Sequence, residues 1–272
     1  MNFSLYSTAP SRQSGFTLIE MVVTIVIIGI LGVGITNFVG RSTQGMADIA
    51  ERQQLATIGW IVSEKVSREL RLALPNSIRM NADGSCVEFV PIVAGTDYLT
   101  VPILSAANNF EAVPFSSYSV NTTQDRVAVY PNALTGLYSL STPGTISGLV
   151  TSTTAGTTAG AITVNLAANH QFFTDSPTNR LYIVQDPVMY CFDSASDFLY
   201  RYREYGFNSV MTTDEDDLDN QTVMGSRLST GSFSYSAGTL LRSAVVNMDF
   251  EVTGDNGATQ AINQEVQIRN VP

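Results

Sequence analysis

A long, largely apolar run opens the chain and gives way to an amphipathic pattern further on. Between Phe16 and Gly40 the only charged residue is Glu20. Beyond this run, apolar residues recur at intervals of three and four, as on one buried face of a helix; they are Leu55, Ile58, Val62, Val66, Leu70 and Ala73. Pro75 follows Leu74 and disfavours a continuing helix. The pattern predicts one helix over residues 17–74, about 58 residues and about 87 Å long.

After Pro75 the pattern changes to short alternating runs separated by turn residues, which predicts strands. Candidate strands lie at 86–90, 126–130, 181–184, 188–192, 198–202, 248–252 and 265–269. The 188–192 and 198–202 runs predict a hairpin that turns at residues 193–197. The segments 139–160, rich in Ser, Thr and Gly, and 212–220, rich in acidic residues, are expected to be irregular. These patterns predict an α+β fold, in which a long N-terminal transmembrane and amphipathic helix packs on a β-rich, antiparallel head.

The same patterns divide the chain into four segments. Residues 1–15 form a leader, 16–40 a transmembrane helix, 41–74 its amphipathic continuation, and 75–272 the β-rich head. Two simpler interpretations of the apolar run stay open: a secretory signal peptide and a plain single-pass anchor. The apolar part of a signal peptide is usually 7–15 residues long, whereas this run has 25. A plain anchor explains the length but not Glu20, because a charge in hydrocarbon costs several kcal/mol unless it is paired.

The residues around Glu20 form a specific motif. The run Gly15-Phe16-Thr17-Leu18-Ile19-Glu20 follows a polar leader with one charge, Arg12, and precedes the apolar helix. This arrangement resembles the prepilin signal of type IV pilins and pseudopilins, which implies that the helix at 16–40 enters the filament core on assembly. The resemblance implies that a prepilin peptidase cleaves between Gly15 and Phe16 and then methylates the new amino terminus at Phe16. It also implies that Glu20 pairs with the terminal amine of a neighbouring subunit during assembly, which makes it an assembly residue and not a catalytic one.

Composition narrows the class of protein further. The chain has 24 acidic and 14 basic residues, a net charge of −10. Because an acidic surface disfavours phosphate backbones, we expect no nucleic acid partner. Cys86 and Cys191 are the only cysteines. An even count in an exported domain predicts one disulfide, which would close a loop of about a hundred residues. Two buried free thiols are the alternative.

The sequence offers little chemistry beyond this motif. It contains no nucleophile elbow, no phosphate-binding glycine loop and no pair of metal-ligating histidines, so we expect no enzyme activity and no catalytic residue. His170, the only histidine, is expected in a polar loop or hydrogen-bonded in the core. The aromatic run 200–205 could stack a sugar or a base, although half-buried strand and turn positions are favoured. Four acidic residues could ligate calcium, but they lack the EF-hand spacing, so a solvated loop is the favoured interpretation. They are Asp214, Asp216, Asp217 and Asp219.

Softer patterns extend the resemblance along the chain. The run 48–53 and the predicted hairpin, with Tyr190–Asp193 and Leu199–Tyr202, are similar to minor pilins of the mannose-sensitive haemagglutinin (MSHA) pilus. This implies a role in pilus initiation, assembly or tip decoration for surface attachment. The implied partners are the peptidase, major and other minor pilins, the inner-membrane assembly platform and the membrane. The protein would be a single-pass inner-membrane protein with a periplasmic head, and would reach the pilus and cell surface after assembly. The alternatives are a larger, J-like minor pseudopilin of type II secretion and a glycan-binding adhesive pilin.

Overall fold

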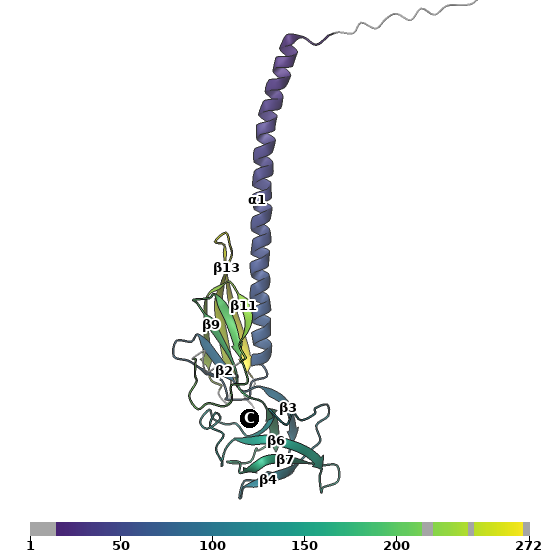
Figure 1. Ribbon diagram of the computed structural model, residues 1–272, viewed down its shortest axis with the longest axis vertical. Coiled ribbons are helices and arrows are strands. Elements are labelled where there is room, and N and C mark those ends of the chain that lie inside the picture. Colours follow the sequence, from purple (N-terminus) through teal and green to yellow (C-terminus); the bar gives the residue numbers. More distant parts are fainter. Residues whose placement is uncertain (1–14, 214–219, 239–241, 269–272) are drawn as a thin grey trace, which may run out of the picture. The chain divides into compact units, whose positions relative to one another are not determined.

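A computed structural model describes residues 15–213, 220–238 and 242–268 (Figure 1). This part of the chain forms one helix, α1 (Leu18–Leu70), followed by strands only. The strands are β1 (Arg79–Met80), β2 (Cys86–Phe89), β3 (Ile92–Asp97), β4 (Ala107–Ala112), β5 (Arg126–Val129), β6 (Ile146–Ala155), β7 (Ile162–His170), β8 (Arg180–Val184), β9 (Val188–Asp193), β10 (Phe198–Tyr202), β11 (Thr222–Ser226), β12 (Leu228–Ser236), β13 (Ala244–Thr253) and β14 (Thr259–Ile268). Every strand pairing is antiparallel, and the predicted α+β fold is confirmed.

The helix ends four residues before the predicted position. Its last residue is Leu70, not Leu74. The backbone N–H of Leu74 donates to the carbonyl of Val90 at 2.8 Å instead of continuing the helical ladder. Ala73 forms a bridge with Pro91. The helix therefore stops where its backbone hydrogen bonds pass to the head, one turn before the proline that marks the end in the sequence.

The chain divides into two compact units within α1, between Glu51 and Arg52. In the first unit, every large apolar side chain from Phe16 to Ile49 is exposed. By length and composition, α1 is able to cross a membrane. So much uncovered apolar surface is stable only in lipid or against other apolar helices.

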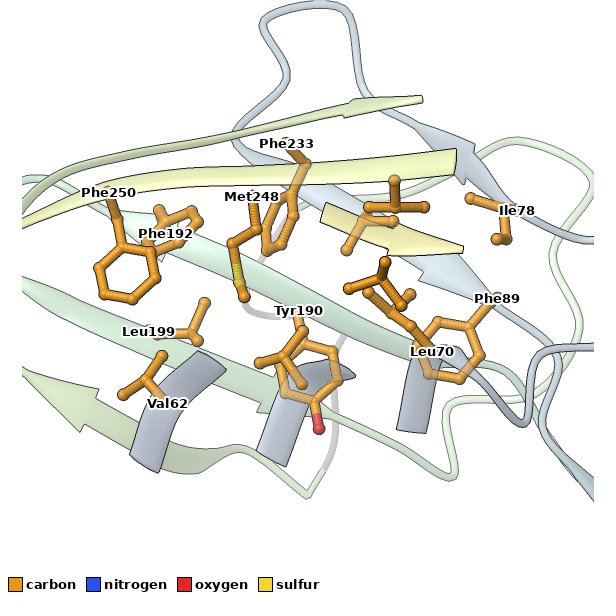
Figure 2. Packing of buried hydrophobic residues seen from close by; sticks show 14 of the residues in the cluster. Val62, Leu70, Ile78, Phe89, Tyr190, Phe192, Leu199, Phe233, Met248 and Phe250 are labelled. Carbon is orange, nitrogen blue, oxygen red and sulfur yellow. The ribbon is translucent and has the colours of Figure 1, made fainter. Parts of the chain in front are cut away.

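In the second unit, the end of α1 packs on the sheets through the face that its periodicity predicts. Leu55, Val62, Val66 and Leu70 are each at most 1% exposed. They share a core with residues of two sheets, of strand orders β1-β2-β9-β10-β11 and β12-β13-β14. Figure 2 shows this core, in which Phe192 lies between aromatic side chains of the second sheet. We call the end of α1 and these two sheets the sandwich.

The remaining six strands form a second module, inserted between β2 and β9. Their order is β3-β8-β5-β6-β7-β4. The two outer strands meet, because Tyr98 after β3 bridges to Ala112 of β4, and the N–H of Val113 donates to the carbonyl of Asp97 at 2.8 Å. The sheet is thus closed into a barrel. Its interior is filled by apolar side chains: Tyr98, Phe110, Ala112, Val127, Val129, Val150, Val164, Leu166, Phe172, Leu181 and Ile183.

The barrel is fixed to the sandwich by a third buried cluster. Leu74 and Val90, next to the sandwich strands, pack with Ala128, Ile146 and Val184 of the barrel. Along β5 and β8 these residues alternate with residues of the barrel interior, so Ala128 and Val184 lie on its outer face. Both faces of these strands are therefore buried where the modules meet, which fixes the barrel on its neighbour.

Two predictions about strands are corrected by the structure. Residues 139–160 are not wholly irregular, because Ile146–Ala155 is strand β6. The many threonine and serine residues of this stretch suggested a loop, although threonine also favours β-strands. The run 86–90 was expected to alternate between buried and exposed residues, but all five are buried. One face of β2 packs in the sandwich core, and Cys86 on the other is covered by Met189 and Tyr202.

The other candidate strands are confirmed; the last of them is confirmed as far as Ile268, because Arg269 lies outside the described residues. Strands β9 and β10 form the predicted hairpin, with Phe192 opposite Leu199. Met248, Phe250 and Val252 of β13 are buried in alternation. In β14, Val266 is buried and its neighbours Glu265 and Gln267 are exposed, as the alternation predicts.

Candidate assembly site

The motif at the start of α1 builds its own helix terminus. The backbone N–H of Glu20 donates to the carbonyl of Thr17 at 3.1 Å and lies 3.3 Å from the Thr17 hydroxyl oxygen. Thr17 is therefore the N-cap, and Glu20 occupies the third helical position, where a capping-box sequence has its Glu. A carboxylate there is also favoured by the helix dipole. The N-cap at Thr17 was not predicted, although the Thr-x-x-Glu spacing in the sequence indicates it.

The bond expected to be cleaved lies just before this cap. Gly15 and Phe16 precede the helix and belong to no secondary structure element. The Phe16 side chain is 81% exposed. An exposed peptide outside regular structure is easily drawn into a protease site. The geometry thus leaves the Gly15–Phe16 bond accessible, while Thr17 already fixes the start of the helix.

Glu20 is exposed, and the residues next to it on the helix are apolar. It has no ion pair with any residue in the described ranges. Leu18, Ile19 and Met21 beside it are all more than 60% exposed. The next basic residue along the chain is Arg41, more than five helical turns away. In hydrocarbon, a carboxylate in this setting needs a cation from elsewhere. The amine that the expected cleavage would create at Phe16, in this chain or a neighbour, is a group of that kind.

In the head, the predicted disulfide is present. Cys86 of β2 and Cys191 of β9 are direct cross-strand partners and are bonded to each other. They are 4% and 8% exposed. Both residues lie outside the inserted barrel, one on each side of it in the sequence, so the bond closes the chain around the whole insertion.

Beside the disulfide lies a buried charge pair that sequence reasoning missed. Arg79 of β1 contacts Glu88 of β2, its cross-strand partner, whose second carboxylate oxygen accepts the Tyr205 hydroxyl at 2.8 Å. The guanidinium also lies over the Tyr138 ring, 3.6 Å from its centroid, and donates to the Asn208 carbonyl at 2.7 Å. Burial first, and then the Glu88 charge, raise the pKa of Tyr205. All these groups are partnered within the fold, which indicates a structural role.

The structure also describes His170 and the aromatic run 200–205, which the sequence singles out. His170 is 2% exposed, with Nε2 3.2 Å from the Gly144 carbonyl and Nδ1 3.1 Å from the Thr142 hydroxyl. Burial lowers the pKa of His170, so the ring is neutral, donates through Nε2 and accepts through Nδ1. The prediction of a hydrogen-bonded core histidine is confirmed. In the run 200–205, the tyrosines are buried or half-buried, as favoured. The acidic residues 214–219 lie outside the described ranges.

Comparison with known families finds one match, at this amino-terminal segment. Residues 10–36 match the prokaryotic N-terminal methylation motif. No curated protein and no solved structure matches the chain. The motif supports a type IV pilin-like or pseudopilin protein, and together with the apolar helix it indicates membrane anchoring. The match includes Gly15 and Phe16, at which cleavage and methylation are expected, and the head lies outside the matched segment.

Proposed function

We propose that this chain is a non-enzymatic minor pilin of an MSHA-type pilus, similar to MshO. It is cleaved between Gly15 and Phe16, methylated at Phe16, and takes part in pilus initiation, assembly or tip decoration for surface attachment. The observation that carries the proposal is the methylation motif at residues 10–36 on a helix whose apolar side chains are uncovered from Phe16 to Ile49. A helix of this kind needs lipid before assembly and other helices after it.

The size of the head supports a minor component. Besides the sandwich, it carries the six-stranded barrel inserted between β2 and β9. A head with an added module is harder to repeat densely along a shaft than to place at a tip or an initiation complex. In this role its partners are the prepilin peptidase, the major and other minor pilins, the inner-membrane assembly platform and the membrane. The head is periplasmic before assembly and at the cell surface afterwards.

Processing is tested by the amino terminus of the mature protein. Gly15→Ala should leave the full-length chain in the inner membrane, whereas wild type should begin at a methylated Phe16 by mass spectrometry. Gly45→Ala is a matched control, because a Cβ there, as at Gly15, would have no neighbour within 4 Å. A mature chain that starts at Met1, or beyond Gly40, would falsify the proposal.

The pairing role of Glu20 is tested separately from the capping role of Thr17. Glu20→Val removes the charge and keeps the Thr17 N-cap, whereas Thr17→Ala removes only the N-cap, at a cost of about 1 kcal/mol. We expect both variants to enter the membrane, and only Glu20→Val to be lost from sheared filaments. Equal loss of the two variants would show that the helix start matters and not the charge.

A larger, J-like minor pseudopilin of type II secretion is the second candidate, because the same methylation motif occurs in that class. Deletion of the chain separates the two. Loss of surface pili with normal secretion of enzymes supports the pilus role, and the opposite result supports the pseudopilin.

A further inference from the structure

A large hollow lies where the end of α1 meets the barrel. Its volume is about 720 Å³, within the range of small-molecule sites. One side is formed by the chain just after the helix, from Arg71 to Pro75, and the other by strands β3 and β8 of the barrel. All of these residues belong to the second unit of the chain. Neither the methylation motif nor the assembly role uses this hollow.

The barrel contributes its outer face to this site. Gly95 pairs with Tyr182, and Asp97 with Arg180, across β3 and β8. The residue between them on β8 is Leu181, which lies in the barrel interior. Because side chains alternate along a strand, Gly95, Asp97, Arg180 and Tyr182 all face outward. Strands β3 and β8 thus present these four residues on the side of the hollow opposite the segment from Arg71 to Pro75.

The site holds two available cations. Arg71 and Arg180 both line it, are exposed, and form no ion pair with any residue in the described ranges. Asp97 lies opposite Arg180 in register, yet their side chains form no ion pair. The hollow thus brings together two arginines that are not neutralised by an ion pair within the described residues. Guanidinium groups bind carboxylates through paired hydrogen bonds.

Gly95 leaves space against an aromatic ring. A Cβ at this position would lie 3.4 Å from the Tyr182 ring. The backbone of Gly95 is not in the left-handed region, so its conformation does not require glycine. A glycine inside a strand often marks the close approach of a ligand or another backbone. Here the missing side chain keeps the space beside the Tyr182 ring open on the side that lines the hollow.

We propose that this hollow binds a carboxylated saccharide. Arg71 and Arg180 hold the carboxylate, Tyr182 lies against the sugar ring, and the Asp97 carboxylate accepts hydrogen bonds from sugar hydroxyls. A phosphate group suits the site less well, because Asp97 repels its higher charge and gains no hydroxyl donors from it. Such a site gives the protein a contact with acidic surface polysaccharides, in addition to its proposed role in the filament.

Calorimetry on the full-length chain in detergent tests the site with trigalacturonic acid and, as its neutral counterpart, galactotriose. We expect binding of the uronide, and a loss of about tenfold or more for the neutral sugar and for each of Arg71→Gln and Arg180→Gln. Lys65→Gln removes an exposed positive charge of α1 outside the hollow and should bind as wild type does. Gly95→Val should also weaken binding, because its side chain would occupy the space beside Tyr182.

Three results overturn the proposal: no binding of the uronide, binding that both arginine variants retain, or equal binding of inorganic phosphate. The arginine variants change exposed side chains, so their thermal unfolding should match that of wild type. If Gly95→Val does not fold, these two variants still decide the question. The measurement needs no filament, so its failure leaves the assembly proposal untouched.

Discussion

Cys86 and Cys191 are joined across β2 and β9, three residue pairs from the point where the chain leaves the sandwich for the barrel. The pair nearest the barrel is Phe89 and Val188. The disulfide therefore clamps the two strands that carry the insertion. Partial opening of the barrel cannot spread past this bond and separate β2 from β9.

Removal of the disulfide should destabilise the head. The cysteines are 105 residues apart, and a crosslink over a loop of this length stabilises by about 3–5 kcal/mol, mainly by restricting the unfolded chain. We expect Cys86→Ala/Cys191→Ala to unfold at lower urea concentration by about that free energy, measured by circular dichroism of the full-length chain in detergent. Wild type treated with reductant in urea should behave like the double variant. Identical midpoints for oxidised and reduced protein would contradict the prediction.

Removal of one charge of the buried Arg79–Glu88 pair should lower the unfolding free energy strongly. Arg79→Met leaves the Glu88 carboxylate, whose side chain is 2% exposed, without its cation, and should cost about 3–5 kcal/mol of unfolding free energy. Arg79→Met/Glu88→Met removes both charges and should recover much of this loss. The exposed pair of Arg203 and Glu204 provides the control, since Arg203→Met should change stability by less than about 1 kcal/mol. A double variant as unstable as the single one would show that the charge is not the cause.

Gly231 of β12 should tolerate no side chain. A Cβ there would lie 2.2 Å from the Phe192 ring in the sandwich core. Gly231→Ala forces this ring to move and should cost about 1–3 kcal/mol in unfolding free energy. Gly148→Ala is the matched control in another strand, because its Cβ would meet no atom within 4 Å. Phe192→Leu should relieve part of the clash in the double variant, and its failure to do so would point to a backbone effect.

Acid should release one contact of the barrel. The Glu111 carboxylate of β4 accepts hydrogen bonds from the hydroxyls and N–H groups of Thr157 and Thr158, which lower its pKa from 4.5 to about 2. Since the folded pKa is depressed, the contact stabilises the fold above pH 4.5 and is lost as pH falls toward 2. A carboxyl ¹³C titration should show the low midpoint, and Thr157→Ala/Thr158→Ala should raise it. A midpoint that the variant leaves unchanged would refute this assignment.

The helix and the assembly motif could be predicted because their signals are local. The spacing of Leu55, Val62, Val66 and Leu70 reports a face that one helix presents, whatever lies against it. The hairpin of β9 and β10 is likewise held by a short turn. The end of the helix was misplaced because it depends on a hydrogen bond from Leu74 to Val90, which sequence periodicity does not report.

The barrel could not be predicted, because its closure joins strands that are distant in the sequence. Its β3 strand pairs with β8 rather than with the next strand, and Tyr98 closes the ring by meeting Ala112. The pairing of distant strands produces no pattern in the sequence that periodicity could detect. The hollow could not be predicted for the same reason: Arg71 and Arg180 line one hollow only when the barrel packs beside the end of the helix.

The entrance and exit of the barrel touch. The N–H of Gln185, just after β8, lies 3.3 Å from the carbonyl of Pro91, just before β3. Because the two ends of the insertion lie side by side, a different domain can replace it without moving β2 and β9, the strands that flank it. The surface that the head presents can therefore change with the inserted module, while the helix that anchors the chain stays the same.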